Sequence, residues 1–106
     1  MSTGTGQWPA PDTAYATAPS MVREIGWTAQ AATDKPFGTR MGREFWLRKA
    51  ALLDRIALAE AAGHGGDTIE VAALAAARLM DLDDTDASCN PRHYVRQQYA
   101  LWANEQ

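Results

Sequence analysis

The sequence has a single cysteine, Cys89, and no long apolar run. One cysteine forms no intramolecular disulfide, which argues against a disulfide-stabilised secreted domain. The first residues have neither the basic segment nor the apolar segment of a signal peptide, and no stretch approaches the roughly 18 apolar residues of a membrane-spanning helix. We therefore expect a cytoplasmic protein.

The chain also lacks a strong excess of either charge. Its ten basic and thirteen acidic residues give a net charge of −3, and no segment is basic enough to predict nucleic-acid binding from charge alone. A length of 106 residues allows one domain at most. Many of the hydrophobic residues are alanines, which bury little area, so the core has to come from the larger apolar side chains beyond residue 36.

Residues 1–36 contain few large apolar side chains and many small polar ones. The prolines among the first 20 residues prevent a regular element, and no apolar period emerges. We expect this segment to be a flexible, disordered N-terminal arm. Ser20 is a suitable N-cap, so residues 21–25 are predicted to form a short helical turn that ends at Gly26 and would be a fourth, N-terminal helix.

Residues 37–106 have the apolar period of helices and predict an all-α domain, a small three-helix bundle. The three helices are expected at about 40–62, 68–82 and 91–103. Asn90 and Pro91 mark the start of the last one. Proline holds the preceding residue in the extended conformation that an N-cap needs, and proline itself suits the first helical position.

The first expected helix, 40–62, is apolar on more than one face. One stripe at helical spacing consists of Met41, Phe45, Leu52 and Ile56. Because Leu47 and Leu58 fall on another side, this helix is either central to the bundle or in contact with another molecule. A core of about 70 residues rarely supplies more than about 3–5 kcal/mol, so further burial is attractive. The leading hypothesis is a non-enzymatic interaction protein, self-associating (a homo-oligomer) or adaptor-type, with an interface at Trp27, Trp46, Leu47 and Leu58.

The other two helices differ in pattern. The segment 68–82 is apolar nearly all round, which predicts a buried helix whose alanines allow close helix packing. The segment 91–103 places its aromatic residues on one side and a polar set on the other: Arg92, His93, Arg96 and Gln97. An alternative function is therefore a DNA-associated regulator that uses this polar face, although the acidic domain and the long connection before the helix argue against a helix-turn-helix. A further alternative is an accessory subunit that stabilises a partner enzyme.

The acidic run from Asp81 to Asp86 lacks the glycine and the glutamate of a calcium-binding loop. We expect a solvated loop at the end of a helix, with its charge repulsion relieved by Arg40, by Arg43 or by an outside cation or basic partner.

Cys89 and His93 suggest a nucleophile and a base, but no third group and no catalytic cysteine motif accompany them. One cysteine and two distant histidines likewise argue against a structural zinc site. We expect no enzymatic activity, no cofactor and no metal.

Residues 42–58 and 93–102 resemble segments of small uncharacterised actinobacterial proteins. The resemblance covers the first and third expected helices. It implies a bacterial, cytoplasmic origin and implies nothing about chemistry, so it assigns no functional residue.

Overall fold

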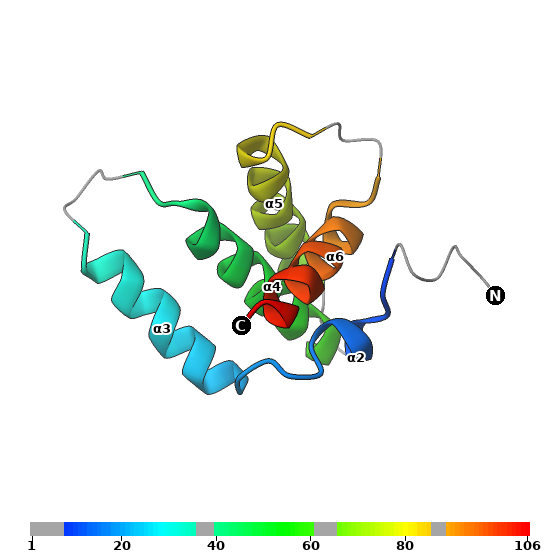
Figure 1. Ribbon diagram of the computed structural model, residues 1–106, viewed down its shortest axis with the longest axis horizontal. Helices are drawn as coiled ribbons and strands as arrows, with labels where there is room; N and C mark the ends of the chain where they lie inside the picture. The colour runs from blue at the N-terminus through cyan, green and yellow to red at the C-terminus, as the bar shows by residue number, and fades with distance from the viewer. Residues whose placement is uncertain (1–7, 36–39, 61–65, 86–88) are drawn as a thin grey trace.

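The computed structural model describes residues 8–35, 40–60, 66–85 and 89–106. Within these ranges every regular element is a helix, which confirms the all-α prediction. Figure 1 shows the elements in chain order: α2 (Pro11–Ala14), α3 (Met21–Thr33), α4 (Arg43–Glu60), α5 (Gly66–Leu82) and α6 (Pro91–Asn104).

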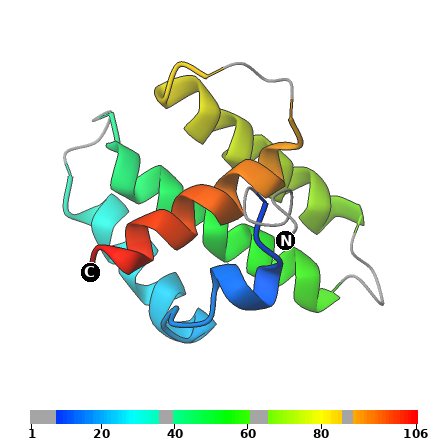
Figure 2. The ribbon, with the colours of Figure 1, turned by 45° about the vertical axis from the view of Figure 1, so that its right-hand side comes forward.

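Helix α4 is the centre of the arrangement. Helix α5 packs along it, α6 crosses it and α3 lies on its remaining side, while α2 contacts α6 (Figures 1 and 2). The three-helix bundle expected from the sequence is therefore formed by α4, α5 and α6. Helices α2 and α3, from the segment expected to be an arm, pack around it.

Helix α3 is longer than the turn predicted for residues 21–25. It begins as expected, with Ser20 Oγ accepting a hydrogen bond from the backbone N–H of Arg23 at 3.2 Å, but it continues through Gly26 to Thr33. A glycine within a helix costs only about 1 kcal/mol relative to alanine, and tertiary packing of α3 on α4 outweighs it. The prediction of an unstructured arm is therefore wrong for α2, where Pro11 takes the first helical position, and for α3. Residues 1–7 and 36 of that predicted arm lie outside the described residues.

An ion pair fastens α3 to α4. The carboxylate of Glu24 is buried and accepts hydrogen bonds from Arg48 Nη2 at 2.7 Å and Arg48 Nε at 3.1 Å. The guanidinium of Arg48 also lies 3.6 Å from the centroid of the Trp27 ring, a cation–π contact. Since Arg48 is bound on two sides, α3 is held in one position against the bundle.

The core consists of small residues packed around a few large side chains. Leu47 of α4 has no exposed surface, and it belongs to a buried cluster that all three bundle helices supply. Of the stripe expected on this helix, Phe45 and Leu52 are buried, whereas Met41 and Ile56 are partly exposed. Helices α3, α5 and α6 all pack against α4, so α4 is the central helix, although Leu58 of its second apolar face stays 37% exposed. The other members of the buried cluster are Ala50, Ala51, Ala75, Ala76, Leu79, Val95 and Tyr99.

The acidic run closes α5 and joins it to the rest of the domain. Asp84 adopts a left-handed conformation with φ of 53°, which aspartate tolerates better than most residues. Asp83 accepts two hydrogen bonds from Arg43, at 2.7 and 2.9 Å, and one from the hydroxyl of Tyr94 at 2.6 Å. Arg43 is thus one of the two predicted counter-charges, and its hydrogen bonds hold the pKa of Asp83 below its usual value. Asp86 lies outside the described residues.

The contact between Tyr94 and Asp83 predicts a pH dependence. Partial burial and the hydrogen bond to the Asp83 carboxylate raise the pKa of Tyr94 from 10.0 to about 12. Its stabilising contribution is therefore complete below pH 10 and is lost as the pH rises from 10 to about 12. We expect the stability difference between the wild type and Tyr94→Phe to be constant at neutral pH and to shrink across this range. Urea denaturation at a series of pH values measures it, and a difference that stays constant to pH 12 would contradict it.

Candidate interaction surface

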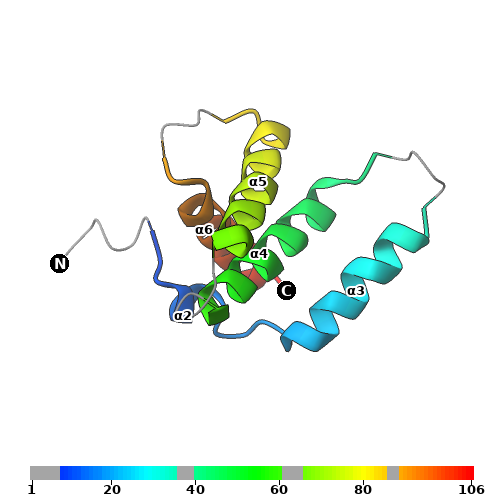
Figure 3. The same ribbon diagram turned by 180° about the vertical axis from the view of Figure 1, so that it is seen from behind.

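A shallow apolar groove runs between α4 and α5. Its volume is about 250 Å³. We call it the α4–α5 groove, and it is lined by Trp46, Lys49, Leu53, Val71, Leu74, Ala75 and Arg78. Figure 3 shows the two helices side by side. Two of its lining residues on α5, Val71 and Leu74, are exposed to solvent.

The orientation of α5 about its axis explains why the groove is apolar. Ala72 and Ala76 face inward and are fully buried, which lets α5 pack closely on α4 as the sequence predicted, whereas Ala77 is on the exposed side. The larger aliphatic side chains are left outside: Leu74 is 70% exposed and Val71 is 47% exposed. The prediction of a helix buried all round is therefore wrong. A small, smooth inner face is enough to pack against α4 and α6.

Cationic side chains border the aromatic end of the groove. The ammonium of Lys49 lies 5.1 Å from the Trp46 ring centroid, and the guanidinium of Arg78 lies 5.6 Å from it. Both are within the range of cation–π attraction. On the same outer stripe of α5, one turn before Leu74, the carboxylate of Glu70 is exposed. The surface thus has an apolar centre with a basic group on one side and an acidic group on the other.

The structure brings one of the four predicted interface residues into this groove. Trp46 lines it. Leu47 is buried in the core, so its assignment to a partner interface is wrong. Leu58 is exposed at 37% but does not line the groove. Trp27 is partly covered by the chain itself, because it lies against Arg48 and its ring centroid is 6.5 Å from that of Phe45.

Sequence reasoning missed Val71 and Leu74 as surface residues, yet the signal was present. Residues 70, 71, 74 and 78 share one face of a helix, and two of them are charged. The alanines at 72 and 76 fall on the opposite face. Charged residues identify the outer face, so the aliphatic residues beside them also had to be outside.

A second polar cluster surrounds Asp54, which is only 1% exposed. Arg96 donates to both carboxylate oxygens, from Nε at 2.8 Å and from Nη2 at 3.0 Å. Arg92 Nε donates at 2.5 Å, and the hydroxyl of Tyr15 donates at 2.6 Å. Burial raises the pKa of Asp54, but the hydrogen bonds from Arg96, Tyr15 and Arg92 outweigh it, so the net pKa lies below the usual value. Asp54 is thus a charged carboxylate with four donors.

The same cluster fixes Tyr15 in its protonated form. Burial and the neighbouring Asp54 charge raise the pKa of Tyr15 well above its ordinary value. Its ring also packs edge-on against Tyr99, with centroids 5.3 Å apart. Tyr15 therefore joins the segment between α2 and α3 to α4 through Asp54 and to α6 through Tyr99. The arrangement is structural because the carboxylate oxygens are already occupied by donors.

This cluster removes two side chains from the face predicted to contact DNA. Arg96 is buried, and Arg92 is turned toward Asp54, so neither is presented as a phosphate-binding group. His93 is exposed and its ring lies 6.1 Å from that of Trp8. Gln97 accepts a hydrogen bond from Gln98 Nε2 at 3.1 Å. The structure thus contradicts the prediction that Arg92 and Arg96 face solvent, while His93 is exposed as predicted.

The cysteine and histidine that suggested chemistry are not built into a site. Cys89 is partly buried, before the start of α6, while His93 is exposed on that helix. Across the described ranges, no group of three or more histidine, cysteine, aspartate or glutamate residues is arranged to hold a metal ion. In the same ranges, every buried side-chain nitrogen or oxygen has a hydrogen-bond partner, so none is left aimed at a ligand.

None of the helices that the structure describes is long and apolar enough to cross a lipid bilayer.

Comparisons with known proteins identify no relative. No family model, curated protein or solved structure matches the chain.

Proposed function

We propose that the protein is a non-enzymatic, self-associating interaction module that docks through the α4–α5 groove. The exposure of Leu74 carries the proposal. It is the centre of an apolar surface with Val71, Trp46 and Leu53, on a helix whose inner face is already occupied by alanine packing. A contiguous apolar surface with a polar border is typical of a protein–protein contact.

The composition of the core supports the same function. Half of the buried cluster consists of alanines, which contribute little apolar area, while full burial of one leucine or valine side chain is worth about 1.5–3 kcal/mol. Covering Leu74 and Val71 in an interface therefore adds burial comparable to that of the larger core side chains. Self-association supplies this additional burial without a further domain.

The α4–α5 groove replaces the interface expected from the sequence. Leu47 cannot belong to it because it is buried, and Leu58 lies elsewhere on α4. The remaining alternative with a heterologous partner, an adaptor or an accessory subunit, uses the same surface. It is distinguished by whether the isolated protein associates with itself.

The test is replacement of Leu74 with lysine. We expect the wild type to elute as a dimer at high micromolar concentration and Leu74→Lys to elute as a monomer, because a charge at the centre of an apolar contact must be desolvated on association. Light scattering coupled to size-exclusion chromatography measures the mass. At a concentration low enough for both proteins to be monomers, the melting temperature should change little, since Leu74 is largely exposed in the monomer.

Leu101→Lys is the matched control. Leu101 is 55% exposed but lies on α6, away from the residues that line the groove. It should leave the dimer intact. If both lysine variants dissociate the dimer equally, or neither does, the α4–α5 groove is not the docking surface.

A further inference from the structure

We infer that a second copy of this chain docks with its α5 antiparallel to α5 of the first copy, around a two-fold axis at Leu74. The inference rests on the proposed self-association and specifies its geometry. It follows from the position of Leu74 within α5 and from the charges on either side of it.

Leu74 is the central residue of α5, which runs from Gly66 to Leu82. In an antiparallel pair of identical helices centred on this residue, each position before Leu74 is level with the equally distant position after it in the second copy. Glu70, four residues before, is therefore level with Arg78 of the second copy, four residues after. The symmetry gives the pair twice, as in every isologous contact.

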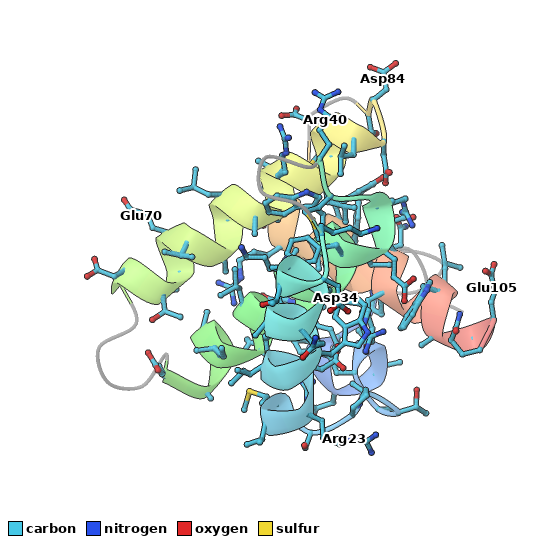
Figure 4. All side chains as sticks on the ribbon, turned by 90° about the vertical axis from the view of Figure 1, so that its left-hand side faces the viewer. Arg23, Asp34, Arg40, Glu70, Asp84 and Glu105 are labelled. Carbon is cyan, nitrogen blue, oxygen red and sulfur yellow. The ribbon has the colours of Figure 1, made fainter. Side chains whose placement is uncertain are left out.

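Both charged residues lie on the stripe that the contact needs. Glu70, Leu74 and Arg78 are four residues apart and so share one face of the helix. All three are exposed, and Figure 4 shows Glu70 pointing away from the bundle. Within the described part of the chain neither Glu70 nor Arg78 forms an ion pair, since the ion pairs found there join other residues. No carboxylate or cation of these ranges therefore competes for either charge, although the Arg78 guanidinium also lies 5.6 Å from the Trp46 ring centroid.

The charges also select the direction of the second helix. A parallel pair in register would place Glu70 opposite Glu70 and Arg78 opposite Arg78, which is repulsive. The antiparallel pair places opposite charges together on both sides of the Leu74 contact. Packed helices lie about 8–10 Å apart, a separation that glutamate and arginine side chains can span.

The ends of the two α5 helices contribute less to the contact than their central residues. Asp67 and Asp81 lie on the same stripe, seven residues from Leu74 on either side, and an exactly antiparallel pair would place them opposite one another. Helices that cross at about 50°, the commonest packing class, diverge with distance from the crossing point. The contact is therefore concentrated on the central residues: Glu70, Val71, Leu74, Ala77 and Arg78.

Charge reversal tests the geometry. The variants are Glu70→Arg, Arg78→Glu and the double variant, each measured by sedimentation equilibrium at low ionic strength, where exposed charges are screened least. We expect each single variant to raise the dimer dissociation constant about tenfold or more, because two like-charge pairs replace two opposite-charge pairs. The double variant should return to within about threefold of the wild type, since both pairs are restored with their signs exchanged.

Mixing the two single variants provides a second measurement. One copy then carries arginine at both positions and the other carries glutamate at both, so the mixture should form heterodimers with near wild-type affinity. Circular dichroism confirms that each variant stays helical; both residue types are good helix formers.

The outcomes separate the inference from the proposed function. If the single variants weaken association but the double variant and the mixture do not recover, or if no single variant has an effect while Leu74→Lys still gives a monomer, the antiparallel register is wrong and self-association stands. If the wild type remains a monomer throughout, both are overturned. Recovery in the double variant and in the mixture supports the two-fold arrangement.

Discussion

Replacement of Asp54 with alanine should lower the free energy of unfolding by about 3–5 kcal/mol, the range for breaking a buried ion pair by removing one partner. Without the carboxylate, Arg96 is left charged and buried, and Arg92 and Tyr15 lose their acceptor. A loss of this size is a large fraction of the stability of a small domain. Urea denaturation followed by far-ultraviolet circular dichroism measures it.

Glu105→Gln is the control for a general effect of removing a carboxylate. Glu105 is exposed at the end of α6, so the free energy of unfolding should change by less than about 0.5 kcal/mol. Asp54→Asn keeps the volume but loses the charge, and it should cost more than the control. A cost below about 1 kcal/mol for Asp54→Ala would mean that the cluster is open to water and does not hold the segment before α3 in place.

Truncation of Leu47 to alanine should also lower the free energy of unfolding substantially. Leu47 has no exposed surface and lies in the cluster shared by α4, α5 and α6, so we expect a loss of about 2–5 kcal/mol in the free energy of unfolding. The cost combines the lost burial with the cavity that remains, because the surrounding alanines have little freedom to fill it. Thermal and urea denaturation of the variant measure it.

Leu58→Ala is the matched comparison on the same helix. Leu58 is 37% exposed near the end of α4, so its truncation should cost clearly less than that of Leu47. Both were expected on the outer face of the helix, so the pair tests the structure against the sequence-based assignment. Equal and small costs would place Leu47 on the surface and contradict the described packing.

The helices themselves were readable from local signals. The side chain of Asn90 accepts a hydrogen bond from the backbone N–H of Arg92 at 2.9 Å, and α6 begins at Pro91, where the Asn-Pro pair predicted it. Capping depends on neighbouring residues only, so it can be predicted from sequence. The alanine face of α5 was similarly predictable, because a helix rich in alanine favours close packing.

The extent of α3 was not readable for the opposite reason. Gly26 resembles a helix stop, and nothing local contradicts that interpretation. What carries the helix past it is packing on α4, chiefly the buried pair of Glu24 with Arg48 and the stacking of Trp27 on Arg48. These contacts join residues more than 20 positions apart, so no local pattern reports them.

The burial of two arginines on α6 was likewise not predictable from local patterns. Arg92, Val95, Arg96 and Tyr99 share one face at helical spacing, yet the arginines were assigned to the solvent face by residue type. Their burial depends on Asp54 of α4, which the sequence alone does not place opposite them. The one hint of a buried ion pair is that Asp54 shares a helical face with apolar residues, alanine and leucine, three and four positions away.

The mass of the unmodified protein in solution tests the central proposal most directly. The chain has a mass of 11.5 kDa. Sedimentation from roughly 1 to 100 µM spans the dissociation constants expected of a small interface. If the exposed leucine on α5 is a docking point for a second copy, the weight-average mass rises toward twice the chain mass with concentration. A value that stays at one chain mass over the whole range would contradict it.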